Sequence, residues 1–167
     1  MKSLMSTITY LEMLSPAQIR ARRCDDAHFA VRECTVKQWQ FNRFLYFTVG
    51  ENWQWNDKRG WSDEQWRDYA ETECLRTFAA YYDGSPAGYF ELRRNVPREV
   101  EIAYFGLFSA FYGRGFGGAL LTYALEEAWR GQTERVWVHT CTEDHPAALA
   151  NYQARGLRVY KVETRSL

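Results

Sequence analysis

The sequence predicts an α+β fold with a mixed, mostly antiparallel central sheet. Residues 75–82 and 86–93 are β-rich runs that flank the turn signal Asp83-Gly84-Ser85, so they are expected to form an antiparallel hairpin. The apolar run 100–108 is expected to pair with that hairpin. Helical and strand patterns then alternate, and 167 residues suffice for one domain, 1–167, with its own core.

The N-terminal part is expected to hold short strands followed by a helix. Residues 8–14 are a strand candidate that ends at Ser15-Pro16, where Ser15 can cap a short helix. Residues 28–34 alternate like a second short strand or an extended loop. Apolar positions recur three and four apart over 35–49, which predicts a helix that Gly50 ends.

A second helix is expected from Ser62 to about residue 73, because Ser62 and Gln65 complete a capping box. Tryptophans gather in and before it, at Trp53, Trp55, Trp61 and Trp66. Two interpretations remain open. The indoles close the end of a small core, or they wall a pocket for a substrate with an apolar or cationic part, since aromatics with a polar edge are favoured at binding surfaces.

Glycines crowd the chain directly after the apolar run 100–108. Gly106, inside that run, suggests a bulge or a splay in the sheet. Apolar residues with helical spacing follow over 119–129. The glycines that precede this helix are Gly113, Gly115, Gly117 and Gly118.

The remaining elements are a strand over 135–140, a helix over 147–154 and a strand over 157–163. His145-Pro146 is expected to open the helix and Gly156 to close it.

A strand, a glycine loop and a helix N-terminus together can bind an anion, because the first amide N–H groups of a helix lack internal acceptors. Glycine lets phosphate oxygens approach the backbone. A purely structural loop is the alternative. Two other phosphate motifs are excluded: Gly117-Gly118-Ala119 lacks the lysine and hydroxyl of a Walker A loop, and the strand 135–140 ends without the ribose-binding carboxylate of a dinucleotide fold.

Charge and composition exclude several classes of protein. Lys plus Arg number 21 and Asp plus Glu number 21, so no global field favours nucleic acid or an acidic membrane surface. No apolar run is long enough to span a bilayer, and a cytoplasmic soluble protein is expected. The four cysteines show no CxxC spacing, which favours reduced thiols over a disulfide framework.

The glycine loop resembles the signature of the GCN5-related N-acetyltransferase (GNAT) superfamily, Gln/Arg-x-x-Gly-x-Gly/Ala. The resemblance runs from Tyr112 to Gly118. Tyr112 stands where the family prefers Gln or Arg, and Ser109 stands where a proline is common.

A second segment, His145 to Leu157, is similar to the family's Asn-x-x-Ala-x-x-Leu-Tyr-x-x-x-Gly-Phe, with Ala148, Tyr152 and Gly156 in register. The resemblance covers nearly the whole chain. It implies helices on both faces of a sheet that splays between its fourth and fifth strands. It also implies transfer of an acetyl group from the co-substrate acetyl-CoA to a primary amine, by direct attack in a ternary complex and without a metal.

Tyr152 and Glu101 are the candidate catalytic residues. By resemblance, Tyr152 donates to the departing CoA thiolate, since a phenol is neutral at pH 7; packing in the core is its alternative role. Glu101 is the only charged residue in the run 100–108, and desolvation is expected to raise its pKa toward that of a useful base. It resembles a strand glutamate that some family members use. Alternatively it forms a salt bridge while a water chain acts as base, and Glu99 is a reserve candidate.

By resemblance, the backbone of Leu107 and Ser109 binds the pantetheine arm, freed by a bulge at Gly106, and the glycine loop binds the pyrophosphate. Arg114 either adds a charge-assisted contact or is solvated. The predicted cofactor residues are Leu107, Ser109, Tyr112, Gly113, Arg114, Gly115, Phe116, Gly117 and Gly118.

The acceptor is expected to be a small-molecule or peptide amine, with no nucleic acid and no membrane as partner. The chain can be a monomer or a homodimer. Candidate acceptor contacts are Trp53, Trp55, His139 and Asp144. The segment 139–145, HTCTEDH, could instead bind a metal or supply Cys141 as a nucleophile, but zinc ligands usually come as two pairs and no second pair is present.

Two other functions remain open at this stage. One is a CoA-binding or sensing module that keeps the fold without turnover. The other is an aromatic-rich interaction domain with no CoA site, which CoA would not stabilise.

Overall fold

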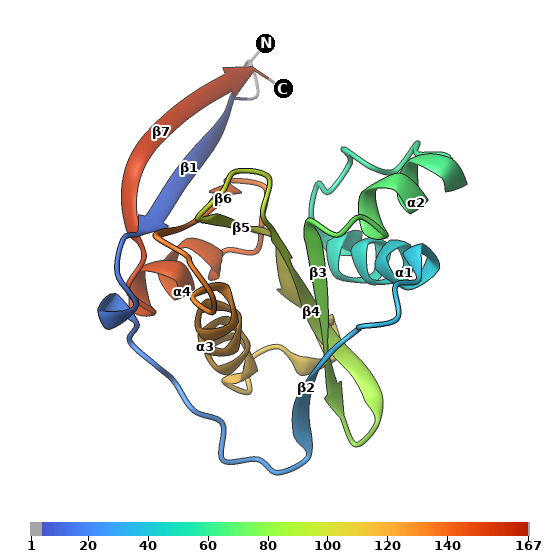
Figure 1. The fold of residues 1–167 in the computed structure, drawn as a ribbon, viewed down its shortest axis with the longest axis horizontal. Helices are drawn as coiled ribbons and strands as arrows, with labels where there is room; N and C mark the ends of the chain where they lie inside the picture. Colours follow the sequence, from blue (N-terminus) through green and yellow to red (C-terminus); the bar gives the residue numbers. More distant parts are fainter. Residues whose placement is uncertain (1–4, 167) are drawn as a thin grey trace.

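The computed structural model describes residues 5–166; residues 1–4 and 167, the ends of the predicted domain, lie outside it. Within this range one sheet has the strand order β2-β3-β4-β5-β6-β1-β7 (Figure 1). The strands are β1 (Met5–Met13), β2 (Phe29–Glu33), β3 (Leu75–Tyr82), β4 (Ser85–Arg93), β5 (Glu99–Leu107), β6 (Arg135–Cys141) and β7 (Arg158–Ser166). The helices are α1 (Trp39–Val49), α2 (Asp63–Ala70), α3 (Phe116–Ala128) and α4 (Ala148–Ala154), with 3-10 turns η1 (Pro16–Gln18), η2 (Gly50–Asn52) and η3 (Ser109–Phe111).

The predicted elements are confirmed, with shifts at their ends. The hairpin β3–β4 and the capping box of Ser62 with Gln65 are both present. The helix α1, however, begins at Trp39 and not at residue 35. Lys37 explains the later start, because its ammonium donates to the carbonyls of Thr72 and Leu75 and holds the preceding residues against the start of β3.

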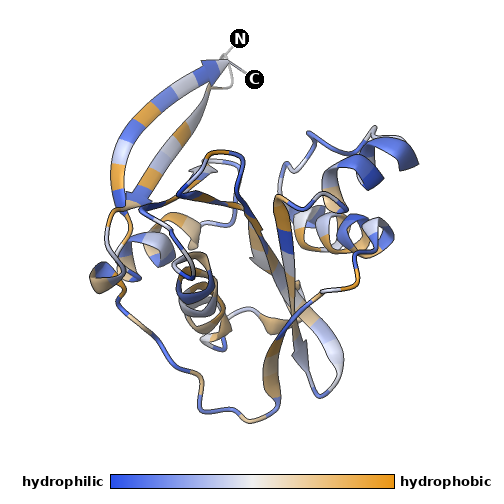
Figure 2. Cartoon of the chain, in the orientation of Figure 1, coloured by the Kyte–Doolittle hydropathy of each residue, from blue (hydrophilic) through white to orange (hydrophobic). Residues whose placement is uncertain are grey.

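Helices cover both faces of the sheet, as predicted (Figure 1). Alternate residues of β4 point to opposite sides: Phe90 packs in the cluster that contains Leu120 and Leu125 of α3, whereas Tyr89 packs with Leu45 of α1. In Figure 2, α2 is hydrophilic over most of its length, because it buries only Trp66 and Ala70. Among residues 5–166, no helix has both the length and the hydropathy needed to cross a membrane.

The sheet splays between β5 and β6. These are the fourth and fifth strands of the resemblance when the short strand β2, which the sequence left open as a strand or a loop, is not counted. These two strands are parallel and pair only over 99–101 with 135–137. The edge of β5 from Ile102 onward therefore faces β6 without a strand partner among the described residues. On the other side of β6, β1 pairs with both β6 and β7, and β1 and β7 continue past the sheet as a two-stranded arm (Figure 1).

The bulge predicted at Gly106 is wrong. Gly106 pairs regularly with Tyr89, and the register of β4 and β5 shifts instead between Ile102 and Tyr104, which makes Ala103 the extra residue. A different contact explains why position 106 is a glycine. A Cβ at position 106 would lie 2.4 Å from Cγ1 of Val49, so the absent side chain lets α1 approach β5 closely.

The segment 14–28 links β1 to β2, which lie far apart in the strand order (Figure 1). It crosses α4 and α3, because the amide of Arg20 donates to the carbonyl of Arg155 at 2.9 Å and the amide of Arg22 donates to Oγ1 of Thr122 at 2.9 Å. This crossing segment, which includes η1, is fixed by backbone hydrogen bonds along its path.

Gly106→Ala is expected to lower the free energy of unfolding by about 1–3 kcal/mol, because the added methyl group overlaps Val49. Adding Val49→Ala should recover part of that loss. Gly60→Ala is the matched control, since nothing lies within 4 Å of a Cβ there. Urea denaturation of the variants measures the differences; an unaltered Gly106→Ala protein would contradict the proposed close contact.

Candidate active site

A cavity of about 940 Å³ opens where β5 and β6 separate. Its walls come from β5, from the glycine loop before α3, from β6, from α4 and from the tryptophan-rich segment 53–58. These parts are distant in sequence, so the splayed sheet brings them together. Of the fifteen predicted cofactor, catalytic and acceptor residues, twelve line this cavity, and Ser109, Arg114 and Phe116 do not. The reserve candidate Glu99 does not line it either.

The glycine loop forms the end of the cavity beside α3. Gly115 is the N-cap of α3 with φ +80°, a left-handed conformation that favours glycine, and no side chain caps the helix. The first amides of α3 are therefore left for an external acceptor. The loop residues that line the cavity are Tyr112, Gly113, Gly115, Gly117 and Gly118.

Three predicted cofactor residues lie elsewhere. Phe116 is 2% exposed and stacks on Phe29 in the core, and the guanidinium of Arg114 lies 4.5 Å from the ring centre of Tyr82 and 3.9 Å from Asp26. Ser109 begins η3, where its carbonyl accepts from the amide of Tyr112. Ser109 and Phe116 were predicted to act through their backbone and Arg114 through its side chain, all from their positions in a motif. Local packing decides where the side chains of Arg114 and Phe116 point.

Leu107 is the last residue of β5 and lines the cavity. Since β6 pairs with β5 only as far as Glu101, the backbone groups of β5 that face β6 beyond this point have no strand partner among residues 5–166. Buried backbone groups need hydrogen-bond partners. This edge of β5 can therefore bind an extended ligand that carries amide groups.

Tyr152 of α4 also lines the cavity, although it is only 5% exposed. Its ring packs 6.0 Å from that of Phe105, and its hydroxyl makes no hydrogen bond within the described residues. Burial, assisted by the charge of Asp144, raises the pKa of this phenol well above its usual value. Tyr152 therefore remains protonated and can donate a hydrogen bond into the cavity.

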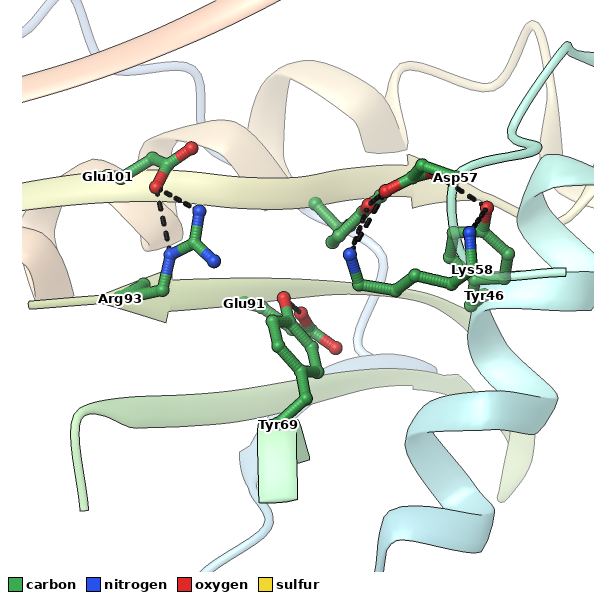
Figure 3. Close-up of polar contacts among 8 residues, drawn as sticks. Tyr46, Asp57, Lys58, Tyr69, Glu91, Arg93 and Glu101 are labelled. Atoms are coloured by element: carbon green, nitrogen blue, oxygen red, sulfur yellow. Dashed lines mark hydrogen bonds and ion pairs between the residues drawn. The ribbon is translucent and has the colours of Figure 1, made fainter. Parts of the chain in front are cut away.

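Glu101 lies on β5, is 8% exposed and forms an ion pair with Arg93 of β4 (Figure 3). Both contacts, at 2.9 and 2.6 Å, end on the same carboxylate oxygen, Oε2. Oε1 is left without a partner inside the described chain. The reserve candidate Glu99 pairs with Arg135 at 3.3 Å.

A second polar group lies beside this pair on the floor of the cavity (Figure 3). The ammonium of Lys58 pairs with Asp57 at 3.0 Å and donates to the hydroxyl of Tyr104 at 2.9 Å. Burial raises the pKa of Asp57, but hydrogen bonds from Tyr104 and Lys58 outweigh it, and the net pKa is lowered. The floor of the cavity thus holds two ion pairs, Asp57 with Lys58 and Glu101 with Arg93.

Beneath this floor, Glu91 is 1% exposed and accepts hydrogen bonds from Tyr69 at 2.5 Å and from Asn42 at 2.9 Å (Figure 3). Burial raises the pKa of its carboxyl. Glu91 does not line the cavity, so its contacts hold α1 and the end of α2 against β4.

The tryptophans divide between the two roles considered for them. Trp66, 1% exposed, packs against Trp61 in the cluster beneath α1 and α2. Trp53 and Trp55 line the cavity, and the indole N–H of Trp55 donates to Asp144 at 3.1 Å. Asp144 is further held by the hydroxyl of Thr140 at 2.7 Å.

The segment 139–145 supplies His139, Cys141, Asp144 and His145 to the cavity wall. Within residues 5–166, no three His, Cys, Asp or Glu side chains are grouped as a metal would require. Burial, followed by the charge of Asp144, raises the pKa of the Cys141 thiol to about 12. A protonated thiol is a poor nucleophile, which disfavours an acyl-cysteine intermediate.

Sequence reasoning missed Arg22 and Arg155, which both line the cavity next to the glycine loop. It also missed Asp57, Lys58 and Arg93 on the floor. One signal was available for the two arginines: a glycine in the first turn of a helix, such as Gly118, often marks close approach of another group.

The model of the acetyltransferase (GNAT) family matches residues 35–157. No curated protein matches the chain. Among solved structures, a GCN5-related N-acetyltransferase from Sphaerobacter thermophilus has a TM-score of 0.71 at 17% identity, over 96% of this chain and 51% of that one. Another from Kribbella flavida has a TM-score of 0.67 at 14% identity, over 95% and 56%. The chain thus spans about half the length of these two proteins.

A shorter structure matches over most of its own length. The aminoglycoside acetyltransferase HMB0005, from an uncultured soil metagenomic sample, has a TM-score of 0.61 at 22% identity, over 80% of this chain and 93% of that one. These likenesses concern the fold. The family match covers most of the chain and includes the glycine loop, Glu101 and Tyr152. The chain belongs to the acetyltransferase (GNAT) family.

Proposed function

We propose that this protein transfers an acetyl group from acetyl-CoA to a primary amine of a small molecule or peptide, within one domain and in a ternary complex. The observation that carries the proposal is the cavity that joins the uncapped N-terminus of α3 to the unpaired hydroxyl of Tyr152 and to the carboxylate of Glu101. One ligand that reaches from the loop to Tyr152 would meet an amine that enters from the tryptophan side.

The residues present fit CoA. The open amides of α3 and the glycines around them suit the diphosphate, and the unpaired edge of β5 at Leu107 suits the amides of the pantetheine arm. The volume of about 940 Å³ lies at the upper end of the usual range of ligand cavities, which suits a ligand as large as acetyl-CoA. When bound, acetyl-CoA supplies the activated thioester.

In the proposed reaction, the neutral amine nitrogen attacks the thioester carbonyl carbon, and the carbon–sulfur bond breaks. The amine loses a proton and the departing thiolate gains a proton or a hydrogen bond. Tyr152 is the proposed donor to the thiolate, because its raised pKa keeps the phenol protonated. Glu101 is the proposed base, since Oε1 is not used by Arg93.

The acceptor is proposed to bind against Trp53 and Trp55, with Asp144 and His139 beside them. Indole faces attract cationic or apolar groups, and Asp144 adds negative charge. Two of the similar structures are aminoglycoside acetyltransferases. That likeness supports a small-molecule acceptor without identifying it.

A thermal-shift assay with acetyl-CoA, CoA and ATP tests the cofactor assignment, because a ligand that binds only the native state raises the melting temperature. A rise with both CoA compounds and none with ATP is expected. The absence of any rise would favour the interaction-domain alternative. A rise without thiol release from acetyl-CoA across an amine library would favour the silent CoA-binding module.

Tyr152→Phe is expected to lower kcat by at least about tenfold and to leave the Kd of acetyl-CoA nearly unchanged, because only the proton donor is lost. The melting temperature should not fall, since the hydroxyl has no hydrogen bond to lose. Tyr89→Phe is the matched control: its hydroxyl is also unpaired, but it is buried outside the cavity. Equal kcat values for the two variants would remove Tyr152 from the mechanism.

Gly117→Asp is expected to weaken acetyl-CoA binding at least about tenfold by placing a carboxylate where the diphosphate is proposed to lie. A Cβ at 117 meets only ordinary contacts, 3.7 Å from Asn151 and 3.8 Å from Leu107, so the helix should fold. Gly117→Asn, of nearly equal size and without the charge, should keep most of the affinity. Calorimetric titration compares them; equal affinities would contradict a phosphate site at the loop.

A further inference from the structure

Two arginines from different parts of the chain meet over the first turn of α3. Arg22 belongs to the crossing segment 14–28, and Arg155 follows α4. An ideal Cβ on Gly118 would lie 2.6 Å from Cδ of Arg22 and 2.5 Å from Nη1 of Arg155. An ideal Cβ on Gly115 would lie 2.8 Å from Nη2 of Arg22. Both side chains therefore occupy the space beside the loop glycines.

Neither guanidinium has an anionic partner within residues 5–166. Their neighbours differ in this respect, since Arg23 pairs with Glu126 at 2.5 Å and Arg130 with Glu127 at 3.1 Å. Nε of Arg155 is buried without a hydrogen bond. Unpaired buried donors are uncommon in native proteins, so Arg155 calls for a ligand that accepts from it. The exposed side chain of Arg22 lies beside the same glycine and can reach the same ligand.

The positive charges of Arg22 and Arg155 also repel each other. Burial, and then the charge of Arg22, lowers the pKa of Arg155. Repulsion of this kind is relieved when an anion binds between the two groups. Gly118 also supports a role for the two arginines. Glycine inside a helix lowers its stability by about 1 kcal/mol relative to alanine, and here it makes room for both arginine side chains.

We propose that Arg22 and Arg155 bind the diphosphate of the acyl-CoA together with the loop amides, since both side chains lie beside Gly118 in the first turn of α3. This inference rests on the proposed function and adds two binding residues to it. Arg22 lies before residue 35, outside the segment that the family model matches, so the crossing segment contributes to the site. A guanidinium can donate two parallel hydrogen bonds to a phosphate, which suits this task.

The phosphate could in principle be the diphosphate or the 3′-phosphate of CoA, and dephospho-CoA, which lacks the latter, distinguishes them. Calorimetric titration of Arg22→Gln and Arg155→Gln with CoA and with dephospho-CoA is the test. Each substitution is expected to raise the Kd of both ligands by about tenfold, the size of one charge-assisted hydrogen bond. Arg→Lys variants, which keep the charge, should lose less.

Arg23→Gln is the matched control, because Arg23 follows Arg22 on the same segment but pairs with Glu126 and lies outside the cavity. Its Kd values should equal those of the wild type. The melting temperatures of the ligand-free Gln variants at 22 and 155 should stay level or rise, since repulsion is removed; a fall in both would mark the arginines as structural and overturn the inference.

The remaining outcomes separate this inference from the function on which it rests. If the wild type binds neither CoA nor dephospho-CoA, both fail. If the wild type binds and the Gln variants bind equally well, only the arginine assignment fails. If affinity falls for CoA alone, the pair contacts the 3′-phosphate and the diphosphate assignment is overturned.

Discussion

The early separation of β5 from β6 is the constraint on which the rest of the site depends. The two strands pair only over 99–101 with 135–137. Backbone groups that lose a strand partner must find another acceptor or donor, so the edge of β5 is open to a ligand. The same separation makes space for α4 to bring Tyr152 into the cavity and for the loop before α3 to face it.

Charge is distributed unevenly along this cavity. On the floor near the tryptophans, Lys58 pairs with Asp57 and Arg93 pairs with Glu101, so the opposite charges largely balance. At the loop, Arg22 and Arg155 add to the positive end of the α3 dipole without a carboxylate in contact. An anionic ligand is therefore favoured at one end, and a neutral or cationic one at the other.

Two glycines let neighbouring side chains pack closely against the backbone around the site. Gly106 lets Val49 of α1 approach β5, which holds the helix that precedes the tryptophan-rich segment against the sheet. Gly118 leaves room for the two arginine side chains. Backbone amides of the crossing segment donate to the carbonyl of Arg155 and to the hydroxyl of Thr122, so the loop is supported from an element far away in sequence.

The sequence by itself determined the class of fold, the order of its elements and the glycine loop, because turn, cap and periodicity signals act over a few neighbouring residues. It also indicated Tyr152 and Glu101 by their places in motifs. Only the tertiary structure decided that Arg114 and Phe116 turn away from the cavity, that the bulge is at Ala103, that Glu101 pairs with Arg93 and that Arg22 meets Arg155. Those contacts join residues from separate elements, and no local pattern encodes a partner that only the packed sheet brings near.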